Sequence, residues 1–456
     1  MFIDEKKIKQ LLKTKKIEAA QAREILANAL QMKSLSLEET AALMTVEDPR
    51  IIQELFCTAK KVKENIYGKR LVIFAPLYIS NFCINDCAYC SFRVSNKDIK
   101  RRALSQEEIA EEVGLLINQG QKRILLVTGE ASTKDDFQYI LDSIRTIYKT
   151  KSGSHGEIRR LNVNIAPLTI TEFKQLKAEN IGTYQLFQET YHKETYKKVH
   201  KQGKKVDYDW RILSMDRAMK AGIDDVSIGV LFGLYDWRFE LLALLQHVEH
   251  LERNFSVGPH TISIPRIEPA AGAELASHPP SPVSDIDFYK LIAILRLAVP
   301  YTGIILSTRE SPEIRRNALA LGVSQISAGS RTNPGGYANK EQMESCQFSL
   351  GDHRSLDEVI KDVASMGYIP SFCTACYRLG RTGEQFMDLA KPGNIKEKCL
   401  LNALITFKEY LLDYASAETK KIGNELINKE LQNISKDHQV LALIKKLELG
   451  ERDLFV

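Results

Sequence analysis

The chain has 456 residues, of which 44% are apolar and 27% charged. At roughly 150 residues per domain, this length fits about three domains or one α/β barrel with extensions. No stretch approaches the ~20 consecutive apolar residues of a membrane-spanning helix, and the net charge of +5 is small beside 63 basic and 58 acidic side chains. We therefore expect no membrane and no nucleic acid as partner. Residues 1–16 carry charges where a signal peptide is apolar, which predicts a cytoplasmic protein with reduced cysteines.

From residue 71 onward, apolar β-branched runs alternate with helical patterns, which is typical of parallel strands joined by crossover helices. Eight strands are predicted, over 71–78, 123–128, 159–166, 183–188, 224–230, 260–266, 302–307 and 323–327. Helices are predicted over 105–119, 135–149, 170–179, 208–220, 237–253, 284–298, 312–321 and 355–366. Ser105 with Glu108 forms a capping-box pattern, and Gly120, Gly222 and Gly322 stand where helices would end. Eight strand–helix pairs predict a (β/α)8 barrel, whose active site forms at the C-terminal ends of the strands.

Two extensions flank this predicted α/β barrel of TIM type, which we assign to residues 71–367. Residues 1–70 form a helical extension, with apolar residues at helical spacing in 8–31 and 38–67. Residues 368–456 begin with a cysteine motif rich in Gly and Pro and continue from residue 400 as amphipathic helices. The sequence therefore predicts three parts, of which the last two carry cysteine motifs.

The first cysteine motif directly follows the first predicted strand, in YISNFCINDCAYCSF. Cys83, Cys87 and Cys90 have the spacing C-x3-C-x2-C, and three thiolates can hold three irons of a [4Fe–4S] cluster, leaving the fourth iron open to a small ligand. A structural zinc site needs four ligands, and this segment has no fourth cysteine and no nearby histidine. The spacing therefore favours an iron–sulfur cluster.

The second cysteine motif begins the C-terminal part. Cys373, Cys376 and Cys399 have the spacing C-x2-C-x22-C and again offer three thiolates with one open coordination position. Zinc is a stronger alternative here, because three cysteines and one histidine form a common zinc site. The remaining Cys57 and Cys346 have no partner spacing, and we interpret them as structural.

Polar residues follow several predicted strands at the barrel face where the first motif lies. We assign three to the reacting substrate, namely Glu189, Arg309 and Ser327, and three to cofactor binding, namely Asn164, Gln188 and Arg266. Arg309 is the candidate for a substrate carboxylate, because a planar guanidinium can bind one in a bidentate way. The alternative for Arg309 is an ion pair with Glu310 or Glu313.

The first motif resembles the signature of the radical S-adenosylmethionine (SAM) superfamily. The resemblance implies a [4Fe–4S] cluster whose open iron binds S-adenosylmethionine, from which a 5′-deoxyadenosyl radical is formed. Tyr89 matches the aromatic position that lies against adenine in that superfamily. Thr128-Gly129-Glu130 is similar to the "GGE" element that contacts the amino group of the sulfonium, with Thr128 in place of the first glycine. Gly129 still permits a close backbone approach.

Both cysteine motifs together resemble the HydG family of tyrosine lyases, which mature [FeFe]-hydrogenase. The resemblance extends over nearly the whole chain and includes FQETYH, YDW, GIDDVSIGVLFGLYDW, GPHTISIPR and ISAGS, and C-x2-C-x22-C is its most specific element. It implies that tyrosine is cleaved at Cα–Cβ to p-cresol and dehydroglycine. Carbon monoxide and cyanide then form at a second [4Fe–4S] cluster, building an Fe(CO)2(CN) unit.

The HydG resemblance also implies partners: free cysteine as an iron ligand, a flavodoxin- or ferredoxin-like electron donor, and the maturation proteins HydE and HydF. His260 opens the sixth predicted strand and faces the end of the barrel opposite the first motif. By the same resemblance it could ligate an extra iron at the second cluster, and the alternative is a buried histidine bonded to backbone.

Two other functions remain open at this point. One is a 2-iminoacetate synthase of thiamine biosynthesis, related to ThiH, with zinc at the second motif. The other is a noncatalytic iron–sulfur scaffold that passes clusters to another protein.

Overall fold

The computed structural model of the chain describes residues 2–131, 134–339, 345–433 and 438–456. Its centre is a closed sheet of eight parallel strands, which confirms the predicted (β/α)8 barrel. In chain order the barrel strands are β1 (Arg70–Ser80), β2 (Arg123–Thr128), β5 (Arg160–Asn164), β6 (Tyr184–Glu189), β7 (Val226–Val230), β8 (Thr261–Ser263), β9 (Gly303–Leu306) and β10 (Gln325–Ser327). Neighbouring strands pair in this order, and β10 pairs with β1 to close the ring.

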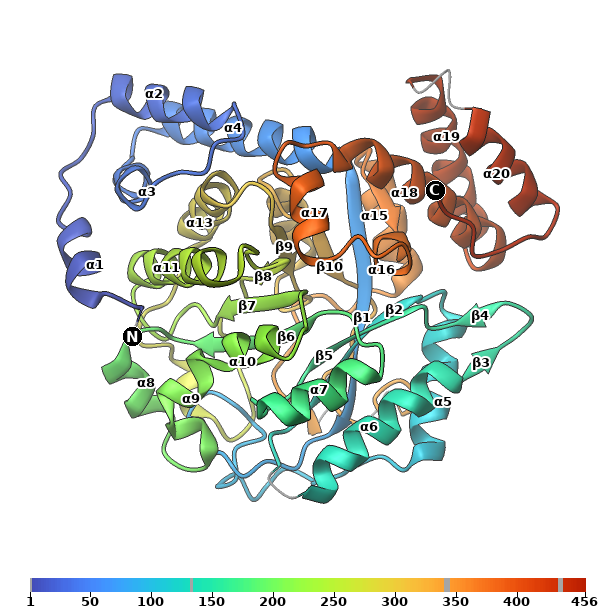
Figure 1. The fold of residues 1–456 in the computed structure, drawn as a ribbon, viewed down its shortest axis with the longest axis horizontal. Helices are drawn as coiled ribbons and strands as arrows, with labels where there is room; N and C mark the ends of the chain where they lie inside the picture. Colours follow the sequence, from blue (N-terminus) through green and yellow to red (C-terminus); the bar gives the residue numbers. More distant parts are fainter. Residues whose placement is uncertain (1, 132–133, 340–344, 434–437) are drawn as a thin grey trace.

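Helices surround the barrel and cover the outward faces of its strands (Figure 1). Those between and after the strands are α5 (Gln106–Asn118), α6 (Lys134–Lys149), α7 (Ile170–Ala178), α8 (Lys193–Val199), α9 (Tyr208–Ile212), α10 (Ser214–Lys220), α11 (Trp237–Phe255), α12 (Glu274–Ser277), α13 (Asp285–Ala298), α14 (Pro312–Leu319) and α15 (Leu356–Ser365). The strands are buried on both faces, as their near-continuous apolar runs require.

The local signals of the sequence are reproduced in most places. The side chain of Ser105 accepts a hydrogen bond from the backbone of Glu108 in a capping box, and Gly120, Gly222 and Gly322 end their helices with φ of 97°, 89° and 128°. The helix predicted over 208–220 is divided into α9 and α10, because the chain leaves helical geometry at Leu213. The helices α8 and α12 and the hairpin of β3 (Lys151–Ser152) and β4 (Gly156–Glu157) were not predicted from the sequence.

The N-terminal extension consists of four helices where two segments were predicted. They are α1 (Glu5–Leu11), α2 (Ala19–Ala29), α3 (Leu37–Met44) and α4 (Pro49–Tyr67). New helices begin where local caps favour them: Ser36 caps α3, and Asp48 precedes the Pro49 that starts α4. The extension packs on the outer layer of the barrel, with α4 against α13 and α3 against α11.

The C-terminal extension continues the barrel sheet before it becomes helical. β11 (Ile369–Ser371) pairs in parallel with the beginning of β1, outside the closed ring. It is followed by α16 (Ala375–Arg378), α17 (Gly383–Ala390), α18 (Ile395–Asp413), α19 (Ala417–Asn433) and α20 (His438–Glu448). In Figure 1 the orange α16–α18 lie toward the top, whereas the cyan loops that follow β1 lie at the bottom. The segments that carry the two cysteine motifs are therefore at opposite ends of the barrel.

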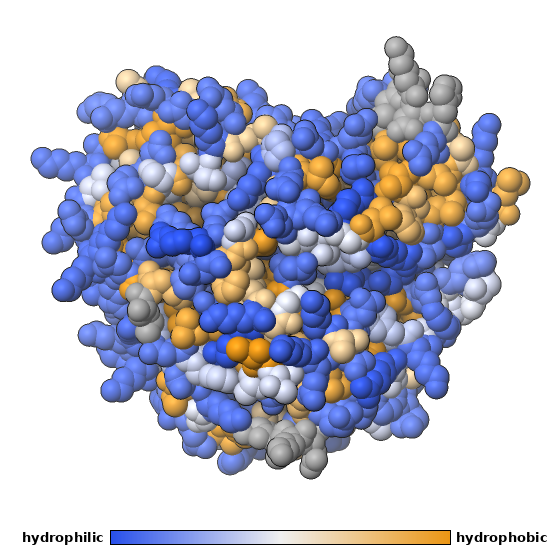
Figure 2. All heavy atoms as spheres, viewed as in Figure 1, coloured by the Kyte–Doolittle hydropathy of each residue, from blue (hydrophilic) through white to orange (hydrophobic). Residues whose placement is uncertain are grey.

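Most of the molecular face in Figure 2 is hydrophilic, with hydrophobic atoms gathered at the upper right, over the C-terminal helices, and at the upper left, over the N-terminal helices. Leu441 in α20 and Leu449 after it are exposed large apolar side chains of this extension. Within the described ranges, no helix combines the length and the apolar character needed to cross a bilayer.

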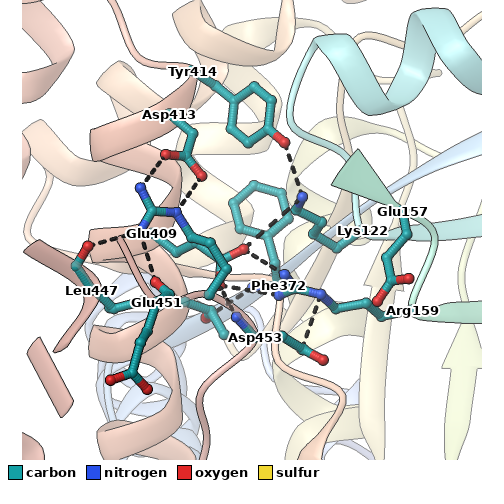
Figure 3. A network of polar contacts seen from close by, with 12 residues as sticks. Lys122, Glu157, Arg159, Phe372, Glu409, Asp413, Tyr414, Leu447, Glu451 and Asp453 are labelled. Carbon is teal, nitrogen blue, oxygen red and sulfur yellow. Dashed lines mark hydrogen bonds and ion pairs between the residues drawn. The ribbon is translucent and has the colours of Figure 1, made fainter. Parts of the chain in front are cut away.

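A buried group of charged side chains connects the C-terminal extension to the barrel (Figure 3). Arg159, just before β5, binds Glu409 of α18 at 2.5 Å, and both side chains are at most 3% exposed. Lys122 lies 3.9 Å from the same carboxylate and donates to the Tyr414 hydroxyl at 2.9 Å. Asp453 joins the group through an ion pair of 2.9 Å with Arg159. The group thus joins α18, which carries Cys399, to the barrel rim.

Replacing Arg159 with methionine should lower the free energy of unfolding by about 3–5 kcal/mol, because Glu409 would stay buried without its main counter-charge. Denaturant titration measures the change. As a matched control, Lys361→Met removes the exposed pair of Lys361 with Glu418 and should cost less than about 1 kcal/mol. Equal effects of the two substitutions would contradict the assigned importance of the buried group.

Candidate active site

A large cavity opens at the C-terminal ends of the barrel strands. Its roughly 1360 Å³ of empty space includes the open mouth. All three cysteines of the first motif line it, together with eight of the other predicted site residues: Tyr89, Thr128, Gly129, Glu130, Asn164, Glu189, Arg309 and Ser327. The structure therefore brings most of the predicted top site together around one space.

The loop that carries the first motif is held by the segment after α8. Ala88 N donates to Val199 O at 2.8 Å, and Asp86 N donates to Gln202 O at 3.1 Å. Burial is the main cause that raises the pKa of all three thiols, to about 11 for Cys90; neighbouring thiols add to it at Cys87 and Cys90, and Glu130 adds to it at Cys83. A metal binds the deprotonated thiolate, so metal binding at these thiols would release their protons. The three residues thus fit a cluster with an open iron.

Tyr89 of the same loop is fixed by a buried histidine. His200 Nδ1 lies 2.9 Å from the carbonyl oxygen of Tyr196 and must donate to it, so its Nε2 accepts from the Tyr89 hydroxyl at 2.8 Å. Burial lowers the pKa of His200, which agrees with this neutral form. The ring of Tyr89 is therefore held at the cavity wall.

The segment Thr128-Gly129-Glu130 follows β2 and packs directly on the cluster loop. A Cβ atom added to Gly129 would lie 2.2 Å from the backbone oxygen of Phe82, so only glycine fits. Gly129 N donates to Ser80 O at 2.8 Å, and Thr128 Oγ1 donates to Gly129 O at 2.5 Å. Thr128 thus replaces the first glycine of the "GGE" pattern without closing the cavity.

A buried network of alternating charges forms one wall of the cavity. Lys205 binds Glu189 at 2.6 Å, and Arg211 binds Glu130 at 2.9 Å and lies 3.5 Å from Glu189. Burial alone would raise the pKa of Glu130, but Arg211 and Lys205 lower it below its usual value. Glu189 has a φ of 71°, a left-handed conformation that is rare for a side chain of its size and is typical of functional sites. Glu130 therefore stays ionised at the cavity wall.

Arg309 lies in the cavity on the opposite side. Its guanidinium carbon is 3.2 Å from the centre of the Phe348 ring, and burial lowers its pKa. The alternative ion pair with Glu310 does not form, because Glu310 binds Arg266. Among the described residues no carboxylate forms an ion pair with Arg309, which leaves its donors available for a ligand. Ser327 is more constrained, since its hydroxyl accepts from Thr308 N at 3.1 Å.

Two predicted cofactor ligands, Gln188 and Arg266, do not line the cavity. Successive strand residues point to opposite faces, and in β6 it is Phe187 and Glu189 that face the cavity. Arg266 lies over the ring of Phe288 on the outer side and also binds Asp285 at 2.7 Å. We therefore leave both residues out of the candidate site.

Among the lining residues that the sequence did not predict are four whose side chains belong to the networks around the cluster loop: Asn85, Lys205, Arg211 and Gln347. Asn85 lies inside the cluster loop and donates to Glu130 at 2.8 Å. The other three come from segments that are not strand ends, so the rule that barrel sites form at strand ends could not find them. Only Arg211 had a nearby signal, the adjoining YDW pattern.

A second, smaller cavity of roughly 540 Å³ lies at the N-terminal ends of the strands. Cys373, Cys376 and Cys399 all line it, beside first residues of the barrel strands such as Arg70, Arg123, Gly303 and Gln325. Burial and the neighbouring thiols raise the pKa of Cys376 to about 12. In the described ranges, no three His, Cys, Asp or Glu side chains surround one ion position, so the thiols share a cavity without converging on one point.

His260 lies in this second cavity, at the barrel end that the sequence predicts. Its side chain is 13% exposed, and its buried Nδ1 has no hydrogen-bond partner, the nearest carboxylate oxygen of Asp225 being 3.6 Å away. Burial lowers the pKa of His260 and favours the neutral form that binds metals. The alternative, a buried histidine that is hydrogen-bonded to the backbone, is not found at Nδ1, because this atom has no hydrogen-bond partner.

Comparison with known proteins agrees with the barrel and the first motif. Residues 77–245 match the model of the radical SAM superfamily, and residues 263–369 match the biotin and thiamin synthesis associated domain. The chain is 33% identical over 359 residues to 2-iminoacetate synthase of Escherichia coli (strain K12), covering 78% of this chain and 92% of that one. A crystal structure of HydG, titled a maturase of the [FeFe]-hydrogenase, superimposes with a TM-score of 0.96 and 49% identity over 100% of both chains.

The chain belongs to the HydG family of radical SAM proteins. HydG from Carboxydothermus hydrogenoformans is 42% identical with a TM-score of 0.82, covering 94% of this chain and 93% of that one. The match to HydG structures includes the C-terminal extension with the second motif, whereas the alignment to 2-iminoacetate synthase leaves about a fifth of this chain uncovered.

Gly129→Ala should weaken S-adenosylmethionine binding on the order of tenfold or more, because the new methyl group must displace the cluster loop at Phe82. Iron content and calorimetric binding measure the effect. Gly114→Ala in α5 is the matched control: nothing lies within 4 Å of the added Cβ, and alanine favours a helix by up to about 1 kcal/mol. Unchanged binding in Gly129→Ala would contradict the close approach.

Proposed function

We propose that this HydG-family chain is a tyrosine lyase that supplies carbon monoxide and cyanide, as an Fe(CO)2(CN) unit, for the [FeFe]-hydrogenase cofactor. The observation that carries the proposal is the position of two three-cysteine sets at opposite ends of one closed barrel. Tyrosine would be cleaved to p-cresol and dehydroglycine at the top, and the two-carbon product would be converted at the second set.

The top cavity has the groups that this reaction needs from the protein. When bound, the first cluster supplies one electron for the reductive cleavage of S-adenosylmethionine. The ionised Glu130 faces the cluster loop and suits the amino group of that cofactor, while Arg309 suits the carboxylate of an amino-acid substrate. Packed walls of the barrel exclude water, which prevents side reactions of a radical.

The second cavity combines thiols with an unusual number of cations. Arg70, Arg123 and Arg381 act on its thiols, and His260 offers a neutral imidazole. A single zinc needs its ligands to converge at about 2.0–2.3 Å, whereas the thiolates of a cluster bind different irons. The separated thiols support a second [4Fe–4S] cluster with an extra iron near His260.

Partners follow from the same proposal. The first cluster needs a low-potential electron donor of the flavodoxin or ferredoxin kind, and the iron unit needs free cysteine as a ligand. HydE and HydF are the proposed maturation partners. The chain also resembles the HydE subunit of Thermotoga maritima, at 31% identity over 31% of its length.

The alternative is a 2-iminoacetate synthase that makes dehydroglycine and carries structural zinc at the second motif. The 33% identity to that enzyme of Escherichia coli supports it. A noncatalytic scaffold is less favoured, because the top cavity contains an elaborate set of charged and polar groups.

Metal analysis separates the first two functions. After anaerobic reconstitution we expect about eight irons and no zinc per chain, from two four-iron clusters. Four irons and one zinc would favour the 2-iminoacetate synthase. Inductively coupled plasma mass spectrometry gives both values on one sample.

The double variant Cys373→Ala, Cys376→Ala should still release p-cresol from tyrosine but form no carbon monoxide, because only the second cavity has lost its thiols. Cys87→Ala should abolish both products. Cys57→Ala, an exposed cysteine of α4, is the control and should retain both. Carbon monoxide at the normal rate in the double variant would refute the division into two sites. Gas chromatography and haemoglobin trapping measure the products.

A further inference from the structure

One hydrogen bond connects a glutamine outside both motifs to a cysteine of the first motif. Gln347 Nε2 lies 3.7 Å from Cys90 Sγ, within the range of a hydrogen bond to sulfur. Gln347 lies between β10 and α15 in the chain, and its side chain lines the top cavity. No pattern in the sequence singles it out, because it lies 257 residues from its partner.

A second hydrogen bond, from Tyr78, determines the orientation of the Gln347 amide group. The hydroxyl of Tyr78, at the C-terminal end of β1, donates to Gln347 Oε1 at 2.8 Å. A thiolate can only accept, so the amide must present its NH2 group to Cys90 and its oxygen to Tyr78. Tyr78 is itself held by an edge-on contact with Phe92, with ring centres 6.1 Å apart.

The backbone around Gln347 is fixed to the cluster loop as well. Ser91 Oγ donates to Gln347 O at 2.9 Å, and Gln347 N donates to Thr332 O at 2.9 Å. The ring of the next residue, Phe348, makes a cation–π contact with the guanidinium of Arg309. This short segment therefore contacts both the cluster loop and the candidate substrate arginine.

We propose that Gln347 is a positioning residue that raises the reduction potential of the first cluster by donating a hydrogen bond to the Cys90 thiolate. The inference rests on the cluster of the proposed function. In the step concerned, the cluster takes up one electron from an external reductant, no bond breaks, and the added negative charge is shared with the thiolates. A donor aimed at one thiolate stabilises the reduced state more than the oxidised state.

The test is a redox titration of the reconstituted protein without tyrosine, with dithionite as reductant and the electron paramagnetic resonance signal of the reduced cluster as readout. Gln347→Leu should leave about threefold to tenfold less reduced cluster at a fixed solution potential, a shift of up to about 59 mV to more negative values. Tyr78→Phe, which keeps the amide but removes the group that orients it, should shift the potential in the same direction by less.

Gln185→Leu is the matched control, because Gln185 lines the same cavity but donates to Ser263 at 3.1 Å and not to a cysteine. Its potential should equal that of the unchanged protein. An unchanged potential in Gln347→Leu at full iron content overturns the proposal. If that variant loses iron, Tyr78→Phe decides, and an unchanged potential there overturns it. Failure of the proposed function would appear separately, as absence of p-cresol from the unchanged protein.

Discussion

The backbone pairing of β1 is the constraint on which both cavities depend. This strand of eleven residues pairs with β10 to close the ring, with β2 beside it, and with β11 from the C-terminal extension. Its end leads directly into the loop of Cys83, while β11 leads directly into Cys373. Because parallel strands run in one direction, a motif after β1 emerges at one end of the barrel, and β11, paired beside the beginning of β1, leaves its motif at the other.

Positively charged side chains of the barrel lie near each set of cysteine thiols. At the top, Lys205 and Arg211 balance two carboxylates beside the cluster loop, and at the bottom Arg70 and Arg123 lie near the thiols with fewer acidic partners. Uncompensated buried cations are unfavourable, so the second cavity is suited to a centre that carries negative charge. A cluster with three thiolates meets that requirement, which connects the electrostatics of the cavity with its proposed content.

The sequence predicted the eight barrel strands and both cysteine sets, because apolar periodicity and ligand spacing are local signals. It also predicted the end of the barrel to which His260 belongs, since that depends only on where a strand begins. Gln188 and Arg266 could not be excluded from the sequence: the side to which a strand residue points changes with every residue, and β6 shifts register at Phe187 and Glu189. Lys205, Arg211 and Gln347 reach the cavity through long-range packing, for which the sequence carries no local pattern.

The linings of the two cavities lie only two residues apart along the same strands. On β1, Val72 lines the lower cavity and Phe74 lines the upper one. On β2, Arg123 lines the lower cavity and Leu125 lines the upper one. The same step of two residues separates Gly303 from Ile305 and Gln325 from Ser327. Two residues of a strand span about 7 Å. In the proposed reaction the two-carbon fragment therefore has a short path along the barrel axis from the upper cavity to the lower one.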